Sequence, residues 1–108
     1  MTKRLTRIAL ACLLAGIMGS AQADVQTGRV KARACAVCHG EFGISILPLA
    51  PNLAGQPAIY LTEQLRAYRS GVRLNEMMSV IAKPLTDAEI ADITAWFSSV
   101  VIEAKPPK

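Results

Sequence analysis

The chain has 108 residues, of which 52% are hydrophobic, and a formal net charge of +4. This length suits one small domain. Three of the twelve basic residues and none of the eight acidic residues lie in residues 1–23, so the rest of the chain has nine basic and eight acidic residues and a net charge of +1. This low net charge argues against nucleic-acid binding, which usually requires a strongly basic domain.

Residues 1–23 have the pattern of a secretory signal peptide. Three basic residues precede a short apolar run over residues 8–18, and Ala21-Gln22-Ala23 forms an A-x-A cleavage site. The run is too short for a comfortable transmembrane helix, so we expect no stable membrane span in the processed protein. We predict export to the periplasm, with residues 24–102 as the folded domain and the proline-containing residues 103–108 as a disordered tail.

Residues 25–37 contain good helix formers and no proline, which predicts a helix. Gly28 is the exception, since glycine in a helix interior costs about 1 kcal/mol relative to alanine. It marks either a frayed helix start or a place where another helix crosses closely, and we favour the crossing.

The run Cys35-Ala36-Val37-Cys38-His39 has the Cys-x-x-Cys-His pattern of c-type haem attachment. Two thiols at this spacing can add to the two vinyl groups of one porphyrin, and the next side chain is then held beneath the iron. His39 is the only histidine of the chain, and the motif occurs once. We therefore predict one covalently bound haem c, with its iron bound by His39.

Two other chemistries use a Cys-x-x-Cys pair. A structural zinc site needs four ligands, and once Cys12 leaves with the signal peptide only Cys35, Cys38 and His39 remain. A thiol oxidoreductase normally places the pair in a βαβ setting, and no strand-like alternation surrounds this motif. Haem attachment is the favoured interpretation, and a dithiol or disulfide role is the principal alternative.

Residues 40–56 contain recurring glycines and prolines and show no regular period. Such a long segment without regular structure is unusual in a compact domain unless it surrounds something, and a haem face is a reasonable candidate. A helix is expected to begin at Pro57, which suits a first helical turn, and to end near Gly71. An irregular loop, residues 72–84, follows.

The last helix has the clearest start signal in the chain. Thr86-Asp87-Ala88-Glu89 is a capping box, and apolar residues then recur at helical spacing. No segment alternates convincingly with period two, so the fold class is all-α. Because short helices with few aromatic residues bury only a modest core, we expect the domain to depend on its haem for folding.

An iron held by His39 has a second axial position. After removal of the signal peptide two methionines remain, Met77 and Met78, and both lie in the loop of residues 72–84. A thioether ligand raises the reduction potential and suits electron transfer. The alternatives are that both methionines pack in the core, or that the site is open to water or gases.

Together these features resemble the small soluble class I c-type cytochromes of bacteria. Beyond the haem motif, the resemblance includes Pro51-Asn52-Leu53-Ala54-Gly55-Gln56, Tyr68-Arg69-Ser70-Gly71-Val72-Arg73 and Leu85-Thr86-Asp87. It implies three main helices around one covalent haem. It also implies that the N- and C-terminal helices cross where Gly28 meets an aromatic residue, Trp96 or Phe97.

The resemblance further implies residue roles. The ligand methionine of the family usually lies seven residues before the leucine that opens the last helix, here Leu85, so Met78 is preferred to Met77. The proline twelve residues after the histidine, Pro51, would accept a hydrogen bond from the other imidazole nitrogen. The cofactor-binding residues are then Cys35, Cys38, His39, Pro51 and Met78, with His39 and Met78 bound to the iron.

These inferences predict a periplasmic one-electron carrier with redox proteins as partners, and not an enzyme. The principal alternative is a cytochrome subunit of a multi-subunit oxidoreductase, for example one that oxidises a sulfur compound. A gas-binding or peroxidatic haem protein with an open distal site is a third possibility. Four basic residues either steer acidic partners or form a solvated helix face with one arginine near a haem propionate; they are Arg66, Arg69, Arg73 and Lys83.

Overall fold

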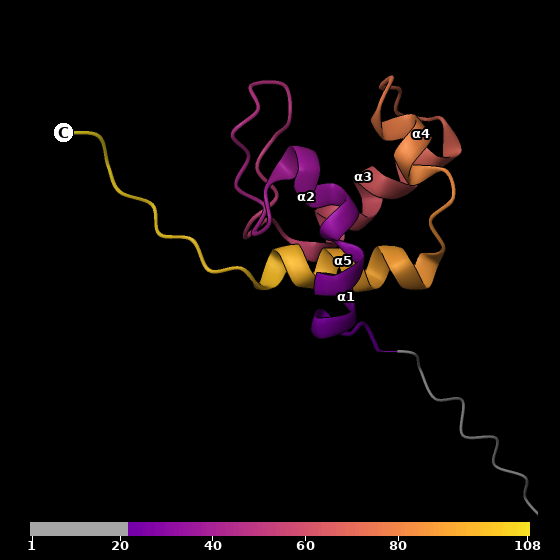
Figure 1. Ribbon diagram of the computed structural model, residues 1–108, viewed down its shortest axis with the longest axis horizontal. Helices are drawn as coiled ribbons and strands as arrows, with labels where there is room; N and C mark the ends of the chain where they lie inside the picture. Colours follow the sequence, from indigo (N-terminus) through magenta and orange to yellow (C-terminus); the bar gives the residue numbers. More distant parts are fainter. Residues whose placement is uncertain (1–21) are drawn as a thin grey trace, which may run out of the picture.

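The computed structural model describes residues 22–108, so all but the last two residues of the predicted signal peptide lie outside the described part (Figure 1). Residues 22–108 form helices and loops without a strand, which confirms the all-α prediction. No helix among them is both long and apolar enough to cross a membrane. The helices are α1 (Val25–Lys31), α2 (Arg33–His39), α3 (Ala58–Ser70), α4 (Met78–Ala82) and α5 (Asp87–Ser99).

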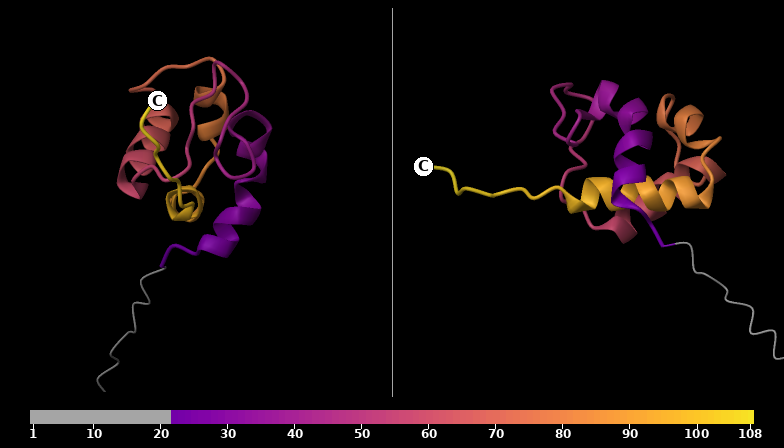
Figure 2. Two further views of the ribbon diagram at one scale, coloured as in Figure 1. Left: turned by 90° about the vertical axis from the view of Figure 1, so that its left-hand side faces the viewer. Right: turned by 60° about the horizontal axis from the view of Figure 1, so that its bottom comes forward.

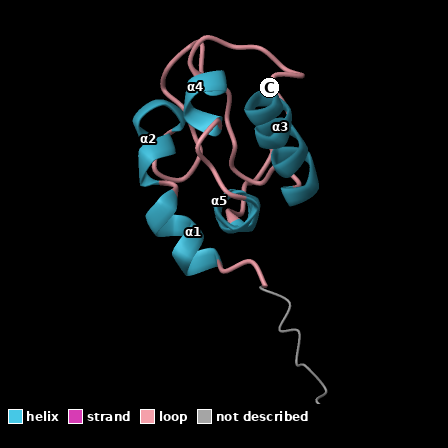
Figure 3. Cartoon of the chain, turned by 90° about the vertical axis from the view of Figure 1, so that its right-hand side faces the viewer, coloured by secondary structure: helices cyan, strands magenta, loops and turns pink. Residues whose placement is uncertain are grey.

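The helices surround the space in which the functional site lies. Seen along α5, the pair α1 and α2 lies on one side and α3 on the other, with α4 opposite α5 (Figure 3). Beyond α5 the chain leaves the domain as an extended segment (Figure 2). The disorder of residues 103–108 and the domain limits at 24 and 102 stay predictions.

The expected crossing of the terminal helices is present, since α1 packs across α5 (Figure 1). Gly28 is buried there. A Cβ atom on Gly28 would lie 1.9 Å from the carbonyl oxygen of Asp92 and 3.1 Å from the Cβ of Trp96. Glycine is therefore required for this close approach. Its aromatic neighbour is Trp96, while Phe97 is buried in the core with Ala32, Leu61 and Ile93.

Hydrogen bonds also stabilise the crossing of α1 and α5. The backbone N–H of Asp24 donates to Oδ1 of Asp92 at 2.9 Å, and Lys31 Nζ donates to Oδ2 at 3.1 Å. The Asp24 carboxylate in turn caps α1 by accepting from the Thr27 backbone N–H. The hydrogen bond from Asp24, together with that from Lys31, lowers the pKa of Asp92.

The single helix predicted over residues 25–37 is in fact two helices. Ala32 separates them with a ψ of −8°, outside the usual helical range, and is buried in the core beside Leu61 and Phe97. The second helix continues to His39 and ends at Gly40, whose φ is +83°. The break separates the residues that cross α5 from those that carry the haem motif.

The other helix boundaries were well predicted. Helix α3 follows Pro57 directly and ends at Gly71, which adopts the left-handed conformation with φ of +82°. The capping box of α5 is formed, with reciprocal hydrogen bonds between Thr86 and Glu89. The prediction of an irregular loop over residues 72–84 was wrong for the five residues of α4. A helix this short has too few residues to show an apolar period.

Candidate functional site

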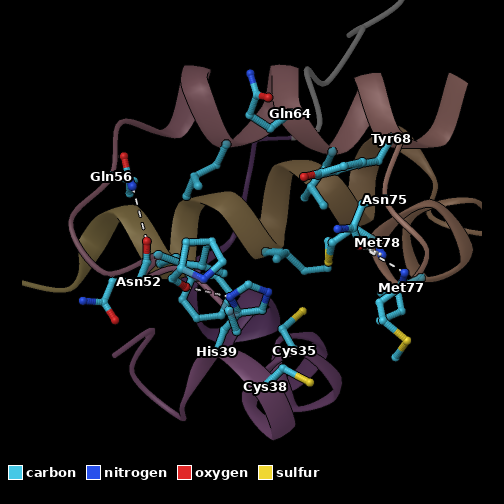
Figure 4. Close-up of a pocket in the computed structure, with 18 of the residues that line it drawn as sticks. Cys35, Cys38, His39, Asn52, Gln56, Gln64, Tyr68, Asn75, Met77 and Met78 are labelled. Carbon is cyan, nitrogen blue, oxygen red and sulfur yellow. Dashed lines mark hydrogen bonds between the residues drawn. The ribbon is translucent and has the colours of Figure 1, made fainter. Parts of the chain in front are cut away.

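A cavity of about 630 Å³ opens between α2, the segment 40–56, α3 and α4, and α5 closes its inner side (Figure 4). The side chains of Ile93, Thr94 and Phe97 line it from α5. The segment 40–56 has no helix or strand, and it contributes lining residues from Leu47 to Gln56. It therefore wraps one side of the cavity, as its irregular sequence suggested.

Helix α2 brings the haem motif to this cavity. Cys35, Cys38 and His39 all line it, and the His39 side chain is largely buried, with 7% of the residue exposed (Figure 4). The two cysteines are not joined in a disulfide. Burial raises the pKa of the Cys35 thiol, which disfavours the thiolate that a dithiol oxidoreductase needs.

The orientation and tautomer of His39 are set by a backbone carbonyl. Its Nδ1 lies 2.8 Å from the carbonyl oxygen of Pro51. Because a carbonyl can only accept a hydrogen bond, Nδ1 carries a proton, and in the neutral ring Nε2 then keeps its lone pair. The hydrogen bond implied by the family resemblance is thus present, and it leaves Nε2 free to bind a metal.

The two methionines of residues 72–84, the segment predicted as a loop, differ in orientation. Met78, the first residue of α4, is half-buried, and its thioether points into the cavity toward His39 (Figure 4). Met77 also contributes to the lining, but it is 63% exposed, and its thioether points away from the cavity centre. The structure therefore brings an imidazole nitrogen and one thioether sulfur to opposite walls of the same cavity.

The segment 40–56 is held in place by bonds within itself and to α2. Ser45 Oγ donates to the carbonyl oxygen of Cys38 at 2.7 Å, and the Ser45 backbone N–H donates to Asn52 Oδ1 at 2.7 Å. The backbone N–H of Leu53 donates to the carbonyl oxygen of Gly43 at 2.8 Å. These bonds fix the loop around Pro51 and hence the carbonyl that orients His39.

The edge of the cavity opposite the cysteines is polar, and it was not predicted from the sequence. Tyr60, Gln64 and Tyr68 line the cavity from α3, and Gln64 and Tyr68 lie across from Cys35 and Cys38 (Figure 4). Their repeat at four-residue steps is the signal that could have revealed them, because residues four apart share one face of a helix.

Arg73 extends this polar edge. Its guanidinium lies 4.7 Å from the ring centroid of Tyr68 and donates to Oε1 of Gln64. Among the described residues that line the cavity, Arg73 alone carries a positive charge, and Glu76 alone a negative one.

The other predicted basic residues do not line this cavity. Arg66 and Arg69 both pair with Asp87, and Arg69 also donates to the carbonyl oxygen of Leu85 at 2.9 Å. The hydrogen bond from Arg69 lowers the pKa of Asp87. Arg66 and Arg69 therefore contact the start of α5 or the chain just before it, and only Arg73 of the four lines the cavity.

These residues suit a haem c. The interior is lined mainly by apolar side chains, the two thiols lie at one edge where the vinyl carbons would be, and the polar edge with Arg73 lies on the α3 side, where the propionates would be. Two donors, one nitrogen and one sulfur, face the middle from opposite walls. The shape and the donor set thus both fit this cofactor.

Comparison with known proteins agrees with the site. The sequence matches the family described as Cytochrome c over residues 26–100. It is 42% identical over 79 residues to cytochrome c-554(548) of Halomonas halodenitrificans, a match that covers 70% of this chain and 95% of that protein. It is 34% identical over 102 residues to the thiosulfate dehydrogenase electron acceptor of Thiomonas intermedia, covering 93% of this chain and 46% of that protein.

The fold is also that of solved cytochromes. The crystal structure of reduced recombinant cytochrome c4 from Pseudomonas stutzeri matches with a TM-score of 0.69 and 35% identity, covering 73% of this chain and 46% of the other. The chain thus spans about half the length of this protein and of the Thiomonas relative, and nearly the whole of cytochrome c-554(548). The chain belongs to the cytochrome c family, as a class I c-type cytochrome whose role is electron transfer rather than catalysis.

Proposed function

We propose that this cytochrome is a periplasmic one-electron carrier with one haem c, attached through Cys35 and Cys38 and bound at its iron by His39 and Met78. The observation that carries the proposal is the placement of the His39 imidazole and the Met78 thioether on opposite walls of one cavity. The single Cys-x-x-Cys-His motif supports a count of one haem.

When bound, the haem supplies the one-electron couple of its iron. The residues of the chain control that couple. Pro51 holds the orientation of the His39 ring, while Met78 offers a neutral, soft donor that favours the reduced state. The apolar lining excludes water, which also favours the state of lower charge.

Arg73 would pair with a haem propionate at the polar edge. The Tyr68 ring and Gln64 hold its guanidinium in place, so little side-chain entropy remains to be lost when an anion binds. A fixed positive charge beside the haem favours the reduced state over the oxidised state. Arg73 therefore contributes to a higher reduction potential.

The absorption spectrum of the ferric protein tests the ligands. A far-red band reports a bond between methionine sulfur and ferric haem iron, and the pyridine haemochrome reports covalent attachment. We expect the wild type and Met77→Ala to show the band and Met78→Ala to lack it. A band that survives in Met78→Ala, or that is lost in Met77→Ala alone, would show that the ligand assignment is wrong.

The periplasmic location rests on the signal-like pattern of residues 1–23 and on the chemistry of haem attachment, which for bacterial c-type cytochromes takes place outside the cytoplasm. Cell fractionation followed by N-terminal sequencing tests it. We expect the haem protein in the periplasmic fraction with Asp24 as its first residue. A cytoplasmic haem protein that retains residues 1–23 would contradict the proposal.

A second candidate is a role with an enzyme that oxidises a sulfur compound, as a separate acceptor or as a bound subunit. Similarity to a protein named thiosulfate dehydrogenase electron acceptor favours this candidate. Gel filtration of a native periplasmic extract separates the forms. Elution near 11.5 kDa or below, the mass of the unprocessed chain, indicates a free carrier, and comigration with a larger redox enzyme indicates a subunit.

A further inference from the structure

Helix α4 carries Met78 but has little stability of its own. It contains five residues, far below the roughly 12–15 at which an isolated helix becomes even marginal in water. Its N-cap residue, Met77, makes no capping hydrogen bond through its side chain. Something outside the helix must therefore satisfy the first backbone N–H groups and fix where the helix begins.

Asn75 fills that role. Its Oδ1 accepts hydrogen bonds from the backbone N–H groups of Met77, at 3.0 Å, and Met78, at 2.9 Å. Ser79 closes the arrangement from the other end, because its Oγ accepts from the Asn75 backbone N–H at 3.0 Å and its own N–H donates to the Asn75 carbonyl oxygen at 2.9 Å. We call these four hydrogen bonds between Asn75 and residues 77–79 the Asn75 bracket.

The bracket acts on both methionines at once. Adjacent residues in a helical turn point about 100° apart, so a turn held in this register directs one of the two side chains into the cavity and the other away from it. Met78 points in and Met77 points out (Figure 4). A shift of the start of α4 by one residue would exchange the two thioethers.

We propose that Asn75, with Ser79, is a positioning residue that selects Met78 over Met77 as the iron ligand. This inference rests on the proposed ligation by Met78. Without the bracket the turn loses its register, and Met77 becomes a competing ligand at the same iron. The effect is a change in which sulfur binds and how firmly it binds, in a protein that remains folded.

The experiment uses the haem-loaded protein labelled with ¹³C at the methionine methyl groups. In the ferrous state the methyl group of the methionine whose sulfur binds the iron is strongly shifted by the haem ring current and gives a separate NMR signal. We expect one such signal in the wild type and two in Asn75→Ala, of which the second disappears in the double variant Asn75→Ala with Met77→Ala. Asn75→Asp, which keeps an acceptor oxygen at the same position, should restore one signal.

Ligand loss on heating gives an independent measurement. Losing a helix-cap hydrogen bond shifts a local equilibrium about fivefold. We therefore expect the far-red band of ferric Asn75→Ala to disappear well below the temperature at which its helical circular dichroism disappears. Thr86→Ala is the matched control, because it removes a comparable cap from α5, away from the cavity. It should lower both temperatures together.

Two results would overturn the proposal. One is a single ligand signal in Asn75→Ala together with band loss and unfolding as close together as in Thr86→Ala. The other is a second signal that persists when Met77 is replaced. If Asn75→Ala does not fold, Ser79→Ala removes one bond of the bracket and should show the same changes at smaller amplitude, and their absence would count against the bracket. A band that survives Met78→Ala would instead overturn the proposed ligation itself.

Discussion

The two sides of α5 are held by different means. On one side α1 packs directly on the helix, with Gly28 against the backbone of Asp92 and three hydrogen bonds around Asp24 and Asp92. On the other side Ile93, Thr94 and Phe97 face a cavity of about 630 Å³. The first side is completed by the polypeptide alone, and the second needs a large apolar group to complete it.

The two sides of α5 therefore have different roles in this small domain. The crossing of α1 and α5 joins the first and last helices of the described residues, and its geometry depends on the absence of a side chain at Gly28. We expect the cavity wall to depend on the haem, which we propose is attached to α2, the helix that follows α1. Because α2 continues from α1 after Ala32, the crossing also sets the position of Cys35 and His39. The packing of α1 on one side of α5 thus sets the position of the haem motif on the cavity side.

The largest effect should come from preventing haem attachment with Cys38→Ala. An unfilled cavity costs roughly 20 cal/mol per Å³, so the 630 Å³ found here would cost about as much as the whole stability of a small domain. We expect this variant and the apo-protein to lose most of their helical circular dichroism. A native-like spectrum without haem would show that the crossing alone can hold the fold.

A clash at the crossing tests the other side of α5. Gly28→Ala would place Cβ 1.9 Å from the Asp92 carbonyl oxygen, and backbone on both sides must shift to relieve the clash. We expect a loss of about 3 kcal/mol in the free energy of unfolding of the holoprotein, with an unchanged far-red band. Gly71→Ala is the control, since nothing lies within 4 Å of its Cβ and only its left-handed backbone is penalised, by about 1 kcal/mol. Equal losses in the two variants would argue against the close crossing.

The sequence predicted what short-range rules determine. The glycine that ends α3 and the capping box of α5 are each complete within a few residues, and both are found as expected. The haem motif is equally local, and its two cysteines and histidine line one cavity. The break at Ala32 was missed because it depends on packing against residues distant in the chain. The choice of Met78 over Met77 came from the family resemblance, since both residues have the same chemistry and adjacent positions.

Protonation of Asp92 should weaken the crossing of α1 and α5 and leave the cavity unchanged. Its pKa lies below the ordinary value of 3.8 in the folded state, because the carboxylate accepts from Asp24 and Lys31. The stabilisation is therefore present above the ordinary pKa and is lost as the pH falls through the lowered value. In thermal unfolding at pH 7 and pH 3, Asp92→Asn should melt below the wild type at pH 7 and lose less on acidification. Parallel curves for the two proteins would contradict this assignment.

The smallest effect is expected at the polar edge of the cavity. Arg73→Gln removes the positive charge beside the proposed propionate and should lower the reduction potential by about 20–40 mV, equivalent to 0.5–1 kcal/mol. Arg66→Gln is the matched control on α3, because Arg66 pairs with Asp87 and does not line the cavity. Potentiometric titration measures both. The same shift in both variants would show that Arg73 acts only through net charge.

We propose that the iron keeps one histidine nitrogen and one methionine sulfur in both oxidation states. Iron X-ray absorption of the ferric and ferrous holoprotein tests it directly, because sulfur scatters differently from nitrogen and oxygen. The predicted result is one sulfur scatterer in each state, absent from both in Met78→Ala. A sulfur that is missing in either state of the wild type, or that remains in Met78→Ala, would contradict it.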